Sequence, residues 1–131
     1  MKSAKKRQAE HVPSSLRLWF IIHFWADLLF ALPLLFAPGQ TLAFFGISGD
    51  AILARLIGAA LIGIGGTSLL ERNASRDTYS ALLTLKLLWS GTATFALLFG
   101  AATTALWSLW LFTAVFFGFF CVWAYFKKTV S

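Results

Sequence analysis

A chain of 131 residues that is 59% apolar and only 12% charged does not have the composition of a water-soluble domain. Soluble domains average about 45–50% apolar and about 25% charged residues, and a fold this small has too little interior to cover 14 Phe and 6 Trp side chains. We therefore predict an integral membrane protein. The net charge is +6. The basic residues behind it are expected to face anionic lipid headgroups, and we expect no nucleic-acid partner.

Four apolar blocks of 20 to 22 residues follow one another along the chain: 18–38, 51–70, 81–100 and 105–126. About 20 helical residues cross a hydrocarbon core of about 30 Å, and a helix satisfies its own backbone hydrogen bonds in lipid. The alternating polarity of a transmembrane barrel is absent. The sequence predicts an all-α fold, an integral membrane bundle of four transmembrane helices over residues 18–126.

Most Lys and Arg residues lie on one side of this bundle. Nine of the eleven lie in a basic N-terminal tail (1–17), in the loop 71–80 and in a C-terminal tail (127–131). The opposite loops, 39–50 and 101–104, carry none. The positive-inside rule then places both termini in the cytoplasm. We expect a multi-pass protein of the bacterial cytoplasmic (inner) membrane.

The first span, 18–38, follows a basic segment and so also resembles a cleaved signal peptide. Its apolar stretch exceeds the usual length of about 7–15 residues, and it contains Asp27. We therefore expect it to be retained. Pro33 should kink or end this helix near its outer end.

A Pro-Gly breaker at 38–39 separates the first span from a short apolar stretch, 41–47. This stretch is too short to span and is predicted to form an interfacial helix. Ser48 or Asp50 is positioned to cap the second span.

Small residues mark one face of the second span, and Arg55 extends this face outward by one turn. Small side chains let helices approach closely in lipid. The predicted helix-packing residues are Gly58, Ala59, Gly63, Gly66 and Thr67. In the alternative interpretation the glycines leave room for a ligand.

Ionisable residues inside membrane spans indicate function because they are costly there. At a rise of 1.5 Å per residue, Asp27 lies about 14 Å deep, with His23 one turn shallower on the same face. Lys86 lies about 8 Å from the inner side and Arg55 about 6 Å from the outer side. Lys86 and Arg55 can snorkel to an interface, but Asp27 is too short and needs a partner, which either of them could supply.

Two polar stripes at a spacing of four residues can face each other, and they come from the first and third spans. They comprise Trp19, His23 and Asp27, and Lys86, Ser90 and Thr94. We predict a polar pocket walled by Trp19, Trp25 and Trp89, with ligand-binding residues Asp27, His23, Lys86, Ser90 and Arg55. The alternative is a structural salt bridge that fixes the order of the helices.

The residues of metal and redox chemistry are scarce. Cys121 is the only cysteine, which excludes a C-x-x-C pair, and it is expected to pack as a small apolar residue. Only His23 of the two histidines lies in a span, and His23 with Asp27 gives too few ligands for a metal. We expect no metal, no cofactor and no enzymatic activity.

The fourth span carries Trp and Tyr residues near both ends, as in an aromatic belt. Phe residues cover nearly all of its faces, so we expect it to be the most lipid-exposed helix. The short loop 101–104 predicts an antiparallel hairpin of the third and fourth spans.

Two motifs, Phe44-Phe45-Gly46-Ile47 and the run Ala54-Arg55-Leu56-Ile57-Gly58-Ala59-Ala60-Leu61-Ile62-Gly63, resemble small uncharacterised bacterial four-helix membrane proteins of the DoxX-like group. The likeness covers about residues 33–72. It implies a four-helix bundle of bacterial origin, sometimes linked to respiratory or redox partners, and it carries over no catalytic residue.

Three function classes remain. The first is binding of a small or lipid-like ligand, or assistance in its transport, with Asp27 at the polar centre. The second is an accessory or assembly subunit of a larger respiratory or transport complex that docks through the second span. An enzyme acting on lipid or quinone is the weakest, because only His23, Asp27 and Lys86 could serve it. The expected partners are membrane lipids, with a homo-oligomer or a larger membrane protein.

Overall fold

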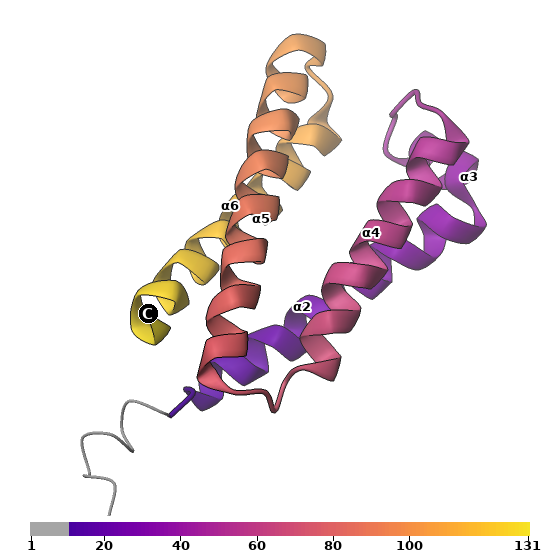
Figure 1. Cartoon of the computed structure of the whole chain (residues 1–131). Coiled ribbons are helices and arrows are strands. Elements are labelled where there is room, and N and C mark those ends of the chain that lie inside the picture. The colour runs from indigo at the N-terminus through magenta and orange to yellow at the C-terminus, as the bar shows by residue number, and fades with distance from the viewer. Residues whose placement is uncertain (1–10) are drawn as a thin grey trace, which may run out of the picture.

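The computed structural model describes residues 11–131, and the basic segment 1–10 lies outside the described residues. The described part is all-α and comprises α2 (Ser14–Phe36), α3 (Pro38–Phe44), α4 (Ala51–Leu70), α5 (Arg76–Thr104) and α6 (Trp107–Val130) (Figure 1). All of these except α3 are long and apolar enough to cross a membrane. The predictions of an all-α chain and of four candidate spans are confirmed.

The helix α2 starts earlier than predicted and continues through Pro33 to Phe36. Proline lacks a backbone N–H, and here it stands in the last turn, so the helix ends within one turn of it. The carbonyl of Pro33 accepts a hydrogen bond from Ala37 N (2.8 Å). The predicted interfacial helix 41–47 is displaced toward the N-terminus, because α3 begins at Pro38, a residue favoured at the first helical position.

The second span matches its predicted bounds, 51–70, and its start is set by Asp50 rather than Ser48. The Asp50 carboxylate accepts from Ile52 N (2.7 Å) and Leu53 N (3.1 Å). These bonds satisfy two of the backbone N–H groups that a helix leaves free at its N-terminus.

Both loops predicted for the second half of the chain are shorter in the structure. The helix α5 begins at Arg76 behind the capping residue Ser75 and ends at Thr104. The turn to α6 is made at Ala105, whose φ of 56° lies in the left-handed region. The predicted hairpin of the third and fourth spans is confirmed, since α5 packs along α6.

The predicted C-terminal tail, 127–131, is mostly helical because α6 continues to Val130. Its residues contact the start of α5: Lys127 Nζ donates to Ser80 O (2.9 Å), and Arg76 Nε donates to Val130 O (2.6 Å). The last turn of α6 is therefore part of the packed structure.

The four long helices form two pairs, α2 with α4 and α5 with α6, and α3 folds against α2 and α4 (Figure 1). The buried face of α4 is lined largely by small residues: Ala54, Gly58, Leu61, Gly65 and Ser68. A Cβ atom at Gly58 would lie 3.1 Å from the carbonyl oxygen of Ala31 on α2. The absent side chain lets the two backbones approach.

The two pairs meet at one end of the bundle, here called the basic end, where α2 and α5 begin and α4 and α6 end (Figure 1). Phe20, Tyr79 and Trp123 are fully buried there. The core cluster comprises Val12, Leu16, Phe20, Tyr79, Leu83, Trp123, Phe126 and Val130. From this end the pairs diverge toward α3. Only 11% of the apolar window of α6 is buried, the lowest share of the four spans, as expected.

Candidate functional site

Four of the five predicted ligand-binding residues lie together where the two helix pairs begin to diverge. His23 and Asp27 stand one turn apart on α2, and Lys86 and Ser90 stand one turn apart on α5. All four side chains are buried, with Asp27 8% and Lys86 2% exposed. The spacing of four residues on each helix therefore brings a carboxyl, an imidazole, an amine and a hydroxyl to one level.

These four side chains are here called the polar centre. Lys86 is held in the polar centre and does not snorkel to an interface. Its Nζ donates to Ser68 Oγ (2.6 Å) and lies 3.1 Å from His23 Nδ1. The same atom lies 4.9 Å from the ring centre of Phe20 and 5.1 Å from that of Trp123. Aromatic faces attract a cation, so two rings and two hydrogen-bond partners stabilise the buried ammonium.

Asp27 approaches the same ring nitrogen of His23 as Lys86 does. His23 Nδ1 is 3.2 Å from Asp27 Oδ2. This oxygen is buried, and no described residue makes a hydrogen bond to it. Gly65 of α4 lies against it, since a Cβ there would be 2.7 Å from Asp27 Cβ. Only a glycine leaves enough room for this carboxyl between α2 and α4.

Sequence reasoning missed Gly65 and Ser68. Both belong to the buried stripe of α4, which alternates in steps of four and three residues from Ala54 to Ser68. Such a spacing is the signature of two helices packed side by side. Reading the small residues in this heptad pattern would have placed both of them against α2.

Arg55 is the fifth predicted ligand-binding residue, and the structure places it away from the other four. It is exposed at the α3 end of α4, and its Nε donates to the carbonyl oxygen of Leu35 (3.1 Å). The last four carbonyls of a helix lack partners within it. Arg55 thus caps the C-terminal end of α2, so of the two partners considered for Asp27 only Lys86 lies near it.

Of the predicted helix-packing residues, only Gly58 is buried within the chain. Ala59 and Gly63 are exposed, and Gly66 and Thr67 are half-buried. A Cβ at Gly63 or Gly66 would meet nothing within 4 Å. The packing face inside this chain is therefore the Ala54–Ser68 stripe, and contact of the predicted face with a second protein stays a prediction.

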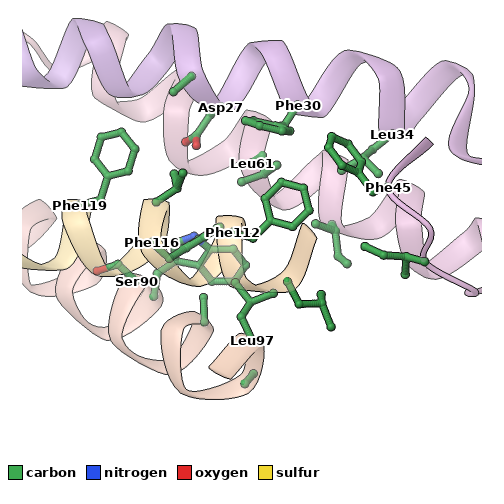
Figure 2. A pocket seen from close by; sticks show the side chains of 18 of the residues that line it. Asp27, Phe30, Leu34, Phe45, Leu61, Ser90, Leu97, Phe112, Phe116 and Phe119 are labelled. Atoms are coloured by element: carbon green, nitrogen blue, oxygen red, sulfur yellow. The ribbon is translucent and has the colours of Figure 1, made fainter. Parts of the chain in front are cut away.

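An apolar cavity of about 330 Å³ lies between the two helix pairs, beside the polar centre (Figure 2). All five described helices contribute to its lining. Figure 2 shows Asp27 pointing into this space from α2, above a wall that includes Phe112 and Phe116 of α6. His23, Asp27 and Ser90 line the same end, and Thr41 is the one other hydroxyl or charged lining residue.

The predicted aromatic walls are correct in one of three cases. Trp89 lines the cavity. Trp25 is 62% exposed on the outside of α2. Trp19 packs edge-on against Phe119, with ring centres 6.4 Å apart, and does not line the cavity. The other aromatic lining residues are phenylalanines: Phe30 of α2, Phe45 after α3, and Phe112, Phe116 and Phe119 of α6.

Within residues 11–131, no three His, Cys, Asp or Glu side chains are grouped as metal ligands. No protein-family model, no curated protein and no solved structure matches this chain. The resemblance of residues 33–72 to the DoxX-like group therefore stays a prediction. The four long apolar helices indicate a small multi-pass membrane protein whose family is not identified.

Proposed function

We propose that this chain binds a small, lipid-like ligand in the cavity between its helix pairs, as a membrane-embedded binding or transport-accessory protein. The observation that carries the proposal is the position of Asp27, a buried carboxyl that lines one end of an otherwise apolar cavity. Intramembrane carboxyls are costly and are retained where they serve a site. The ligand interacts non-covalently, and no catalytic step is proposed.

The size and lining of the cavity support an apolar ligand. Binding sites for small molecules have volumes of about 300–1,000 Å³ and apolar walls with a few polar groups that fix orientation. The cavity of about 330 Å³ falls at the lower limit of this range. A ligand with one apolar chain and one polar head satisfies both parts of the site, with the head at Asp27 and the chain toward α3.

We further propose that the protein lies in the bacterial cytoplasmic membrane with both termini inside. Of the described Lys and Arg side chains, all except Lys86 and Arg55 belong to the basic end, namely Arg17, Arg72, Arg76, Lys127 and Lys128. Under the positive-inside rule that end faces the cytoplasm. The wider α3 end then faces the outer leaflet, where lipids are the ligands at hand.

Native mass spectrometry of the protein in native lipid discs tests this proposal. We expect a bound amphiphile that is lost in Leu97→Trp, because Leu97 lines the cavity and a larger side chain fills it. Leu98→Trp is the matched control, since Leu98 is the next residue of α5 and is exposed outside the cavity. Equal retention of the amphiphile in both variants would contradict the proposal.

The same experiment separates this proposal from the accessory-subunit alternative. In that alternative, a larger membrane protein co-purifies and is lost when Gly63, on the exposed face of α4, is changed to Trp. Loss of such a partner in Gly63→Trp, with no effect of Leu97→Trp, would favour the accessory role.

A further inference from the structure

The polar contacts around Asp27 restrict what kind of ligand head can bind there. His23 Nδ1 lies 3.1 Å from Lys86 Nζ and 3.2 Å from Asp27 Oδ2. A ring nitrogen either donates through its hydrogen or accepts through its lone pair. Nδ1 therefore serves one of these two neighbours at a time, and the protein gives the Asp27 carboxyl at most one hydrogen bond.

A carboxylate has about four acceptor sites on its two oxygens. Since Asp27 is 8% exposed, membrane lipid and water cannot supply the missing donors freely. A buried carboxylate without partners is costly, so the cavity-facing side of Asp27 lacks a donor that a ligand can provide. Asp27 thus favours a head group with an O–H or N–H.

The neighbouring hydroxyl points to the same conclusion from a different helix. Ser90 Oγ, which also lines the cavity, donates its hydrogen to the carbonyl oxygen of Lys86 (2.7 Å). Its lone pairs remain as acceptors. Two side chains at this end, Asp27 and Ser90, therefore present hydrogen-bond acceptors to the cavity.

The charge of the site decides between a charged and an uncharged head group. Lys86 and Asp27 contact the same imidazole nitrogen, so their opposite charges balance within two hydrogen-bond lengths. A charged head of either sign would bring a net charge into an apolar cavity, which is strongly disfavoured. An uncharged hydroxyl donates to Asp27 and adds no net charge to the cavity.

Building on the proposed function, we infer that the ligand is a neutral amphiphile whose hydroxyl head donates to Asp27, beside Ser90, with its apolar chain between the helix pairs. Long-chain alcohols and monoacylglycerols share this chemistry. Ethers, carboxylates and ammonium amphiphiles with the same chain lack the match in hydrogen bonding or in charge.

A series of probes with the same chain tests this inference. Native mass spectrometry of the full-length protein would compare 1-dodecanol, its methyl ether, dodecanoate and dodecylammonium, with 1-monododecanoylglycerol as a fifth probe. We expect a hydroxyl probe to bind at least about tenfold more tightly than each of the three others, as one hydrogen bond to a charged acceptor implies. The tighter of the two hydroxyl probes identifies the source, a free alcohol or a glycerolipid.

Asp27→Leu provides the matched variant, because it keeps the volume and removes the acceptor. There we expect 1-dodecanol and its methyl ether to bind equally, with both still excluded by Leu97→Trp. Should the ether, the acid or the amine bind wild type as tightly as the alcohol, and Leu97→Trp block it, the hydroxyl inference is wrong while the cavity proposal stands. Probe binding that Leu97→Trp does not change would instead refute the proposed function itself.

Discussion

The two ends of this bundle use the same four helices and differ in how the helix pairs meet. At the basic end, Phe20 packs against Tyr79 and Trp123 with ring centres 4.7 and 5.7 Å apart, and these rings leave no space. Toward α3, the pairs touch mainly through Phe45 and Phe112, whose ring centres lie 4.8 Å apart. A cavity remains between these two regions of contact.

The sizes of the side chains explain the difference. In the middle of the bundle the facing residues of α2 and α5 include Ala26, Ala93 and Ala96, all of which line the cavity. Alanine cannot bridge helices that diverge, whereas the rings of the basic end can. The polar centre lies at the boundary, where the closely packed end changes to the open one, so its groups are fixed from one side and accessible from the other.

The largest effect on stability is expected at the basic end. Phe20→Ala removes a ring that contacts Tyr79, Trp123 and the Lys86 ammonium. It should reduce the free energy of unfolding by about 3–5 kcal/mol, measured by denaturation in mixed micelles. Phe36→Ala is the control, because Phe36 is 81% exposed and its loss should change stability little. A comparable loss in both variants would show that the basic end is not the packed core.

The second largest effect on stability is expected when the charge balance of the polar centre is broken. Lys86→Met keeps the chain length but leaves the Asp27 carboxylate without its countercharge, and breaking a buried pair costs about 3–5 kcal/mol. The double variant Lys86→Met/Asp27→Leu should recover much of this loss. The same micelle denaturation measures the cycle, and strictly additive effects would argue against coupling of the two groups.

The contact between α2 and α4 gives a smaller effect. A Cβ at Gly65 would press on Asp27 at 2.7 Å, so Gly65→Ala should cost about 1–3 kcal/mol by overpacking. Gly63→Ala, where a Cβ meets nothing within 4 Å, should be neutral or stabilise by up to about 1 kcal/mol through helix propensity. Equal free energies of unfolding for the two variants would contradict packing of the Ala54–Ser68 stripe against α2.

The smallest effect on stability is expected at the α3 end of the bundle. Ser108 Oγ donates to the carbonyl oxygen of Phe45 (2.7 Å) and so ties α6 to the segment after α3. Ser108→Ala should cost about 1 kcal/mol and speed hydrogen exchange in α3. Thr113→Ala serves for comparison, since Thr113 donates within its own helix to Leu109 O (2.7 Å). If exchange in α3 rises equally in both variants, this tie does not hold the open end together.

Much of the fold could be predicted from the sequence because spans depend on one-dimensional properties. The length of an apolar block fixes a span, as the matching bounds of α4 illustrate. Depth follows from residue number, so His23, Asp27 and Lys86 could be brought to one level. The ends were harder to predict, because polar residues such as Ser75 and Lys127 continue or cap helices beyond the apolar block.

The main obstacle to predicting the site from the sequence was the direction in which each residue faces. Arg55 and Asp27 could be matched by depth and reach, yet Arg55 faces the end of α2 and bonds Leu35. On α4, small residues occur on more than one face, and the predicted face included Gly63 but not Gly65. Which face packs depends on the neighbouring helix, and that information is not contained in the period of one segment.

Photo-crosslinking tests the central claim most directly. A long-chain alcohol with a diazirine in its chain would be activated with the protein in lipid discs, and the labelled residues mapped by mass spectrometry. The account predicts labels on cavity residues such as Phe112 and Phe116, lost in Leu97→Trp and kept in Leu98→Trp. Labels confined to outward-facing residues such as Phe95 and Phe99, unchanged in both variants, would contradict it.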